Sequence, residues 1–237
     1  GVLAPCIRTL KKKDSSRSSM IISMSDVIFV TNRKLCREDF LTRIERLAQS
    51  CPKAVILREK DLSPEEYTRL AAKVMEICRA RGTLCILHTF ADTAEKLHAA
   101  ALHLSMDGLR KLDHRQRKKL SVLGASCHSA AEASEAEALG CTYITAGHIF
   151  NTDCKAGVPG RGTDYLQQIC SRVSIPVYAI GGIDPANAAA VREAGAAGIC
   201  VMSAAMTCAD PSALSAALGG SPENRYDRAS GQTGENQ

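Results

Sequence analysis

Short apolar runs alternate with longer helical patterns along most of this chain, and this alternation limits the fold more than any other feature of the sequence. The runs have the length and apolar character of buried strands, and helix-start signals such as Ser63-Pro64 and Asp184-Pro185 open several of the segments between them. The predicted strands are Val27–Thr31, Ala54–Arg58, Leu84–His88, Leu102–Leu104, Gly124–His128, Tyr143–Ala146, Val177–Ile180 and Gly198–Met202. The predicted helices cover residues 38–49, 64–80, 91–99, 113–120, 129–139, 163–172, 185–194 and 210–217.

Eight strand–helix units within about 190 residues predict an α/β fold, a (β/α)8 TIM barrel that forms a single domain over residues 25–218. The alternative is a doubly wound open sheet, but no Gly-x-Gly-x-x-Gly pattern follows the first predicted strand. In a barrel of this kind the carboxyl ends of the strands meet at one mouth, where ligands bind. Polar residues at the predicted strand ends are therefore the first candidates for a functional site.

Two segments fall outside the repeating pattern. Residues 1–24 are basic and Ser-rich, and we expect a disordered leader or a non-native extension, with an Arg/Ser-rich targeting peptide as the alternative. Residues 219–237 lack periodicity and predict a disordered tail. Of the net charge of +5, the leader carries +4 and the tail −1, which leaves +2 for the barrel. Because that excess is small, we expect no nucleic-acid partner.

Composition narrows the class of protein further. Apolar residues make up 45% of the chain and aromatic residues only 4%, so we expect a sizeable core that is mainly aliphatic. No run of 18 or more apolar residues predicts a membrane span, and no membrane partner is expected. The eleven cysteines include no Cys-x-x-Cys pair, which favours reduced thiols in a cytoplasmic protein over a zinc site.

The last three predicted strands end in loops suited to a phosphate group. A polar, Gly-rich loop runs from Gly147 to Gly162 and contains Thr152 and Lys155, which suit an anion. Gly181-Gly182 and Met202-Ser203 follow the next two strands. Backbone N–H groups in such loops, together with the start of a helix, bind phosphate in many barrels. Turn glycines are the plainer explanation of a lone Gly-Gly pair, but two suitable loops in succession favour a phosphate site.

Two other strand ends suit acid–base chemistry or anion binding. Ser126 and His128 lie two positions apart and so face the same side of their strand, where a histidine can take and return a proton near neutral pH. Arg58 and Lys60 close the second predicted strand and suit a carboxylate or a phosphate. A surface charge cluster explains that pair equally well, and a lone strand histidine is more often structural. The other histidines show no metal-ligand spacing, so no metal and no cofactor are expected.

Four ordered segments resemble the thiamine phosphate synthase/TenI superfamily. They are Leu-Arg-Glu-Lys-Asp-Leu at 57–62, Gly-Ala-Ser-Cys-His-Ser at 124–129, Gly-His-Ile-Phe-Asn-Thr-Asp-Cys-Lys at 147–155 and Ala-Ile-Gly-Gly-Ile at 179–183. The resemblance covers about residues 25–208, and the run through Gly160-Arg161-Gly162 resembles the TenI branch, the thiazole tautomerases. It implies a barrel of thiamine biosynthesis that binds a small phosphorylated thiazole, with a homodimer as a family expectation.

The chain also departs from the synthase pattern, in which Mg²⁺ held by carboxylates helps to join a pyrimidine pyrophosphate to the thiazole phosphate. Leu57 stands where the synthase motif begins with Gln, and His88-Thr89 stand where its third strand ends in Asn-Asp. Ser105-Met106-Asp107-Gly108 replace a Gly-Gln-Asp/Glu-Asp pattern after the fourth strand. These departures predict a metal-independent isomerase, a thiazole tautomerase, rather than a synthase.

The resemblance implies roles for individual residues. His128 falls on the histidine of the family's Ser-x-His-Ser motif and is expected to move the proton that aromatises a carboxythiazole phosphate tautomer. The expected substrate-binding residues are Arg58, Lys60, Ser126, Thr152, Lys155, Gly181, Gly182, Met202 and Ser203. The alternatives are an active thiamine phosphate synthase, which is a transferase, and a non-catalytic TenI-type barrel that senses a thiazole phosphate.

Overall fold

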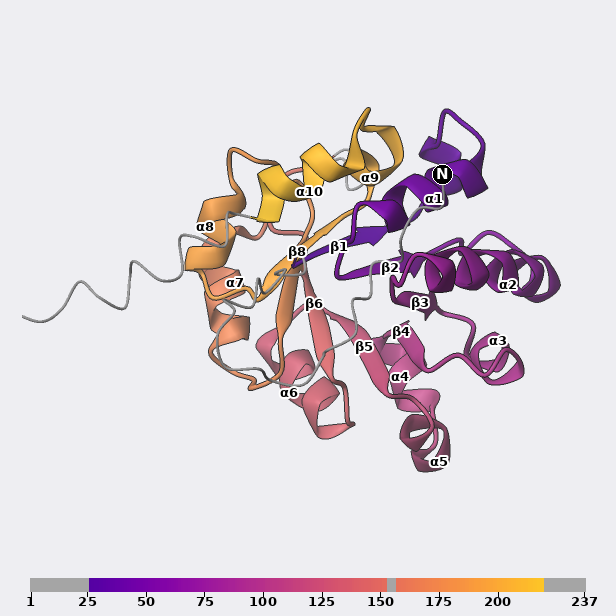
Figure 1. The fold of residues 1–237 in the computed structure, drawn as a ribbon. Helices are drawn as coiled ribbons and strands as arrows, with labels where there is room; N and C mark the ends of the chain where they lie inside the picture. The colour runs from indigo at the N-terminus through magenta and orange to yellow at the C-terminus, as the bar shows by residue number, and fades with distance from the viewer. Residues whose placement is uncertain (1–25, 153–156, 220–237) are drawn as a thin grey trace, which may run out of the picture.

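Eight parallel strands close into a barrel in the order in which they occur in the chain (Figure 1). The computed structural model describes residues 26–152 and 157–219, and β1 pairs with both β2 and β8. The predicted (β/α)8 TIM barrel is confirmed. Its strands are β1 (Val27–Val30), β2 (Ala54–Leu57), β3 (Cys85–His88), β4 (Ala101–Ser105), β5 (Val122–Cys127), β6 (Tyr143–Gly147), β7 (Val177–Ile180) and β8 (Gly198–Val201).

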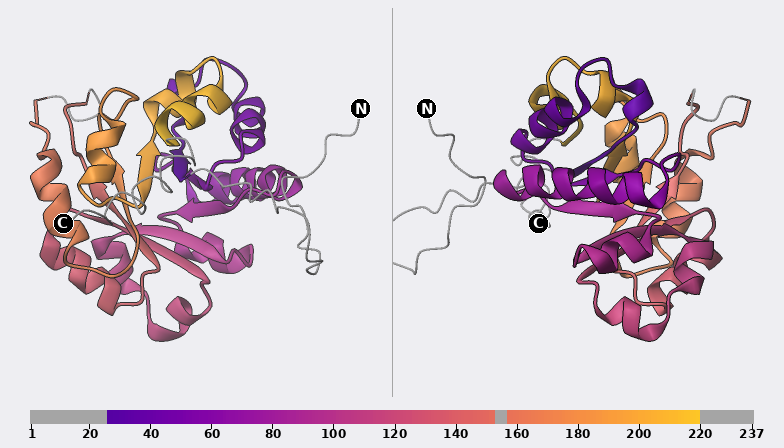
Figure 2. Two further views of the ribbon diagram at one scale, coloured as in Figure 1. Left: turned by 60° about the vertical axis from the view of Figure 1, so that its left-hand side comes forward. Right: turned by 90° about the vertical axis from the view of Figure 1, so that its right-hand side faces the viewer.

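Helices surround the strands on the outside (Figure 2). The structure adds three short helices that were not predicted, the 3-10 helix η1 after β1, α4 directly after β4 and α9 directly after β8, because three to six residues are too few to show a helical period. The helices are η1 (Arg33–Leu35), α1 (Phe40–Gln49), α2 (Pro64–Ala80), α3 (Ala91–Lys96), α4 (Met106–Lys111), α5 (His114–Lys118), α6 (Ala130–Ala138), α7 (Gly162–Cys170), α8 (Ala188–Glu193), α9 (Ser203–Thr207) and α10 (Pro211–Gly219).

Several boundaries differ from the predicted ones by one or two residues. β2 ends at Leu57 and β5 at Cys127, so Arg58 and His128 lie just beyond their strands. Helix α10 extends to Gly219, the first residue of the predicted tail. The rest of that tail and the predicted leader lie outside the described residues.

Strand residues alternate between two apolar layers. The inside of the barrel contains Ile56, Ile86 and Tyr143, whereas Leu57 and Leu87 pack between the strands and the helices. Because successive strand residues face opposite sides, the residues that follow Leu57 and Leu87 in the chain face the inside of the barrel at its carboxyl end. Among the described residues, no helix combines the length and apolar character that a membrane crossing requires.

A buried carboxylate connects the ends of β1 and β2. Glu59 is 2% exposed and accepts hydrogen bonds from the hydroxyl of Thr31 at 2.7 Å and from the backbone N–H of Arg33 at 3.0 Å. The guanidinium of Arg33 donates to Glu59 at 3.1 Å and to Asp61 at 2.6 Å. Thr31 accepts from the N–H of Arg58 at 2.9 Å, so the network fixes the backbone that carries Arg58.

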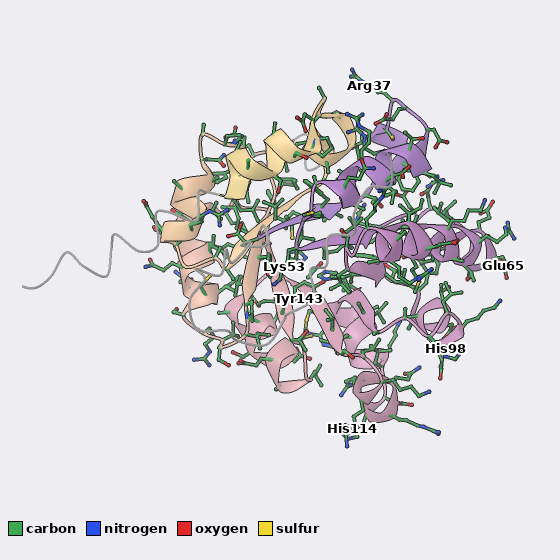
Figure 3. The ribbon with its side chains drawn as sticks, in the orientation of Figure 1. Arg37, Lys53, Glu65, His98, His114 and Tyr143 are labelled. Atoms are coloured by element: carbon green, nitrogen blue, oxygen red, sulfur yellow. The ribbon has the colours of Figure 1, made fainter. Side chains whose placement is uncertain are left out.

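Replacing Glu59 with alanine is expected to lower the free energy of unfolding by about 2–3 kcal/mol, because buried donors of Thr31 and Arg33 lose their acceptor. Urea denaturation measures the change. Glu65→Ala is the matched control, since Glu65 is exposed on α2 and its removal should alter stability by less than about 0.5 kcal/mol (Figure 3). Equal stability of the two variants would contradict a structural role for Glu59.

Candidate functional site

Arg58 and Lys60 bring positive charge to the mouth from the end of β2. Arg58 is half-buried, and its Nη1 lies 3.9 Å from Sδ of Met202, which follows β8. Lys60 is exposed. Burial is the main cause of the lowered pKa of His88 at the end of β3, and the charges of Lys60 and Arg58 add to it. The structure therefore brings this predicted pair together over the part of the mouth between β8 and β3.

Two uncharged histidines stack at the ends of β3 and β4. His88 and His103 are opposite each other in the β3–β4 register, and their ring centroids are 5.3 Å apart. Burial lowers the pKa of His88 to about 2, with further contributions from His103, Lys60 and Arg58. Burial also lowers the pKa of His103 to about 3, and the charge of Lys60 adds to this effect. Both rings are therefore neutral at physiological pH.

Hydrogen bonds connect His103 on β4 to side chains on β5 and β6. Its Nδ1 lies 2.9 Å from the hydroxyl of Tyr143, and its Nε2 lies 2.9 Å from the hydroxyl of Ser126. Thr145 on β6 donates to Oγ of Ser126 at 3.4 Å. Burial raises the pKa of Tyr143, so its hydroxyl keeps its proton. Because a neutral imidazole donates from one nitrogen and accepts at the other, the network fixes the orientation of the predicted Ser126.

The backbone after His88 is strained. Thr89 has a φ of 72°, and the N–H of Phe90 donates to the carbonyl of His88 at 2.9 Å, which closes a γ-turn of the rare, positive-φ form. A β-branched residue in this conformation costs roughly 1–3 kcal/mol. The hydroxyl of Thr89 lies 2.6 Å from Nδ1 of His88, and its N–H donates to the carbonyl of His103 at 3.0 Å. The strained turn therefore fixes the position of His88.

Replacing Thr89 with asparagine is expected to raise the free energy of unfolding by about 1 kcal/mol, because asparagine adopts a positive φ more readily. Chemical denaturation measures the gain. Thr89→Val retains the β-branch and removes the hydroxyl, so it should be less stable than the native chain. A native chain more stable than Thr89→Asn would show that the hydroxyl contact outweighs the strain.

His128 does not join the network of Ser126, although the two residues are only two positions apart. His128 is exposed, and its Nδ1 lies 3.1 Å from the carbonyl oxygen of Gly147. Its backbone N–H donates to the carboxylate of Glu132 at 2.6 Å. His128 therefore contacts the end of β6, whereas Ser126 contacts the histidine pair.

Gly181 and Gly182 allow the loops after β6 and β7 to pack closely. Their φ angles are 103° and 65°, and a Cβ at Gly182 would lie 2.3 Å from the carbonyl oxygen of Asn151. The carbonyl of Gly181 accepts from the N–H of Phe150 at 3.0 Å. The predicted glycines thus position the first residues of the long Gly-rich loop. Thr152, in that loop, is half-buried, and the predicted Lys155 lies outside the described residues.

The short helix α9 begins at Ser203, directly after β8. Met202 precedes it and provides no side-chain cap for its first N–H groups. In many barrels a phosphate binds between the loops after the seventh and eighth strands and the start of a short extra helix, and α9 is a helix of this kind. Gly182, Met202 and Ser203 therefore lie at the part of the mouth where the sequence predicts a phosphate.

Four described carboxylates that follow the strands on this side of the barrel have protein partners. The partners are Thr31 and Arg33 for Glu59, Arg33 and Lys34 for Asp61, Arg110 for Asp107 and the N–H of His128 for Glu132. Mg²⁺ prefers carboxylate oxygens and water. Within residues 26–152 and 157–219, no group of three or more His, Cys, Asp or Glu side chains is suited to a metal ion. The described residues therefore do not fit the Mg²⁺ site that the synthase pattern implies.

Two cavities lie outside the barrel rather than at its mouth. One of about 320 Å³ is lined by residues of α3 and α5, and one of about 630 Å³ lies between α2 and the start of β3. Neither is lined by a predicted site residue. The mouth is identified instead by the strand ends and by the chemistry of their side chains.

The cluster of His88, His103 and Tyr143 was not predicted from the sequence. Spacing along the chain gave no signal, because the two histidines lie on different strands. The strand alternation that points Arg58 inward does the same for His88 and His103, and it would have identified them once the β3–β4 register was known.

Comparisons with known proteins agree with the barrel. A family model described as "Thiamine monophosphate synthase" matches residues 27–205. The thiamine-phosphate synthase of Fusobacterium nucleatum is 33% identical over 179 residues, which cover 75% of this chain and 87% of that protein. The synthase of Roseiflexus sp. is 33% identical over 195 residues, or 81% of this chain and 83% of that protein. A thiamine phosphate pyrophosphorylase from Pyrococcus furiosus superimposes with a TM-score of 0.69 at 26% identity, covering 88% of this chain and 98% of that one.

These relatives correct the predicted activity. They are named as synthases, which are transferases, so the prediction of an isomerase and thiazole tautomerase is wrong. The proton shift assigned to His128 belonged to that activity and falls with it. The superfamily and the link to thiamine biosynthesis agree with the relatives, whereas the homodimer and the cytoplasmic location stay predictions. Since the family model spans the barrel from β1 to α9, this chain belongs to the thiamine monophosphate synthase family.

Proposed function

We propose that this chain is a transferase of the thiamine-phosphate synthase type, which joins a pyrimidine carried as its pyrophosphate to a phosphorylated thiazole. The bond between a pyrimidine carbon and pyrophosphate breaks, a bond from that carbon to the thiazole forms, and pyrophosphate leaves. The observation that carries the proposal is the 33% identity to a thiamine-phosphate synthase over 75% of the chain.

The mouth offers separate places for two anionic substrates, which supports this reaction. Arg58 and Lys60 provide positive charge between β8 and β3. The backbone N–H groups at the start of α9 and the loop of Gly181-Gly182 suit a phosphate beside β7 and β8. We assign the pyrophosphate to the first place and the thiazole phosphate to the second.

In this proposal Ser126 lies between the two places and hydrogen-bonds a substrate. Its hydroxyl is oriented by His103 on one side and Thr145 on the other, at 2.9 Å and 3.4 Å. A fixed hydroxyl loses little freedom when it binds a ligand, which favours binding in one orientation. His128 would meet the substrate from the β6 side, without the proton transfer first assigned to it.

A second candidate is a barrel that binds these phosphorylated ligands without joining them. The observation that favours it is the set of departures from the synthase pattern at Leu57, His88-Thr89 and Asp107-Gly108. Asp107 follows β4 on α4, but its carboxylate is 85% exposed and pairs with Arg110 at 3.0 Å. The two candidates differ in whether a product forms.

Incubation with both synthase substrates is expected to yield thiamine phosphate and one equivalent of pyrophosphate, measured by chromatography in Mg²⁺ and separately in EDTA. Replacing Arg58 with alanine should lower kcat/KM about 10²-fold, because the departing pyrophosphate loses a cation. Lys53→Ala is the matched control, since exposed Lys53 precedes β2 at the opposite end of the strand. Ligand binding without product in either buffer would reject the transferase and support the second candidate.

A further inference from the structure

We infer that the part of the mouth formed by β2, β3 and β4 binds the pyrophosphate group of the ligand without a divalent cation, through Arg58, Lys60 and neutral polar groups beside His88. The inference rests on the proposed function and specifies how that function's pyrophosphate is held. It starts from the mismatch between the described carboxylates and the Mg²⁺ site of the synthase pattern.

Neutral groups fill the place at the end of β3 where the synthase pattern has Asn-Asp. His88 is 6% exposed, stacks on His103 at 5.3 Å between centroids and lies 2.6 Å from the hydroxyl of Thr89. The strained turn at Thr89 fixes this arrangement. A carboxylate ligand for a metal is therefore absent from both positions, and an imidazole and a hydroxyl take its place.

Among the described residues, the charged groups that act on His88 are cations. Arg58 and Lys60 approach from the loop after β2, and both act electrostatically on His88. The groups on the neighbouring strands are the hydroxyls of Ser126 and Tyr143, which carry no charge. Positively charged surroundings repel a metal cation and attract the pyrophosphate anion.

Glu59 does not supply a metal ligand in this region, although it lies between the two cations in sequence. Its carboxylate is buried and accepts from Thr31 and twice from the backbone N–H of Arg33, at 3.0 and 3.1 Å. Those contacts hold it at the end of β1. Glu59 is therefore held away from the place at the end of β3, and it does not bring a carboxylate to that place.

The neutral state of the histidines supports the same conclusion. The pKa of His88 is lowered to about 2 and that of His103 to about 3, mainly by burial. Both ring nitrogens of His103 are already bonded to Tyr143 and Ser126, so His88 and the neighbouring hydroxyls are the neutral groups that can donate to phosphate oxygens at any ordinary pH. Arg58 adds charge-assisted hydrogen bonds, which are the stronger kind.

Calorimetric titration of the full chain with inorganic pyrophosphate tests the inference. In EDTA we expect binding, and we expect Arg58→Ala to weaken it about tenfold or more. Millimolar Mg²⁺ should leave the apparent affinity unchanged or lower it, because the metal withdraws free pyrophosphate in solution. Absence of binding in EDTA, or binding about tenfold tighter in Mg²⁺, would overturn the inference.

The double variant His88→Asn with Thr89→Asp provides the converse test, since it restores the Asn-Asp of the synthase pattern at the end of β3. Aspartate tolerates the positive φ at this position better than threonine does, so the backbone can be retained. In this variant Mg²⁺ should tighten pyrophosphate binding about tenfold. Binding that Mg²⁺ leaves unchanged in the folded variant would contradict the account of these two positions.

Electron paramagnetic resonance of Mn²⁺ with the native chain and pyrophosphate gives a second measurement that needs no variant. We expect the Mn²⁺ spectrum recorded with protein and pyrophosphate to match the spectrum recorded with pyrophosphate alone. A spectrum of immobilised, protein-bound Mn²⁺ would overturn the inference. The proposed function is tested separately by product formation. If pyrophosphate binds in EDTA but no thiamine phosphate forms, the transferase is rejected and the inference is retained. If product forms only in Mg²⁺ and pyrophosphate binding depends on the metal, the transferase is retained and the inference is rejected.

Discussion

Lowering the pH from 7 to 5 is expected to lower the free energy of unfolding by about 4 kcal/mol through His88 and His103 alone. Both have folded pKa values far below the ordinary 6.5, at about 2 and about 3. In the unfolded chain each takes up a proton as the pH falls through 6.5, while in the folded barrel each stays neutral. The unfolded state then binds more protons, so stability is complete above pH 6.5 and declines as the pH falls toward the folded values.

The surroundings of the pair explain why the folded state resists protonation. The charge of Lys60 acts on both rings and that of Arg58 acts on His88, so a proton on either ring would be repelled by like charge. The hydroxyls of Tyr143 and Ser126 bond both nitrogens of His103, and no carboxylate of the described residues balances a proton on that ring. Burial removes the remaining stabilisation by water.

Urea unfolding at pH 5, 6, 7 and 8 measures the decline. His88→Asn removes one titrating group, so its stability should fall by about 2 kcal/mol instead of about 4 over the same range. Exposed carboxylates with a lowered pKa, such as Glu135, also weaken the fold in acid, so the difference between the native chain and the variant is the informative quantity. His114→Asn is the control, because His114 lies on the outer helix α5 and both His88 and His103 are retained (Figure 3). Equal declines for the native chain and His88→Asn would contradict the buried neutral pair.

The strands were predictable because each depends on local properties. Short apolar runs form buried strands, and Ser63-Pro64 with Glu66 forms the capping box that starts α2. The strand ends also placed Arg58, Gly182 and Met202 at one mouth, as the structure does. These inferences need only the chain order and the alternation of side chains.

The histidine pair and its network were not predictable, because they depend on the register between strands. His88 and His103 meet only because β3 and β4 pair at that step, and Tyr143 reaches His103 across 40 positions of sequence. The spacing of Ser126 and His128 predicts that both face the same side of one strand, but β5 ends at Cys127. Only Ser126 joins the network, since the side chain of His128 turns to Gly147.

The predicted activity was wrong for a different reason. The predicted tautomerase activity rested on a few departures from the synthase pattern, such as His88-Thr89 in place of Asn-Asp, and not on similarity along the whole barrel. The named synthases are 33% identical over 75% and 81% of the chain. The same departures indicate the local charge of the mouth, because a changed side chain alters that charge directly. They do not by themselves indicate the type of reaction.

Replacing Gly182 with alanine is expected to lower the free energy of unfolding by about 3–5 kcal/mol and to weaken binding of the phosphorylated thiazole. Two costs add. The φ of 65° is unfavourable for alanine, and the new Cβ would lie 2.3 Å from the carbonyl oxygen of Asn151 and 2.9 Å from the carbonyl carbon of Phe150. Backbone atoms cannot move aside as a flexible side chain can, so the loop after β6 must shift as a whole.

Gly140→Ala separates the two costs. Gly140 has a φ of 92°, but nothing lies within 4 Å of the position its Cβ would take, so only the backbone cost of about 1–2 kcal/mol is expected. Denaturation of both variants gives the difference that belongs to the contact with Asn151. Hydrogen exchange at the N–H of Phe150, which donates to Gly181, should become faster in Gly182→Ala and stay unchanged in Gly140→Ala. Equal losses of stability in the two variants, with unchanged exchange at Phe150, would mean that the loops after β6 and β7 do not depend on each other. In that case their packing would not form the phosphate place beside β7.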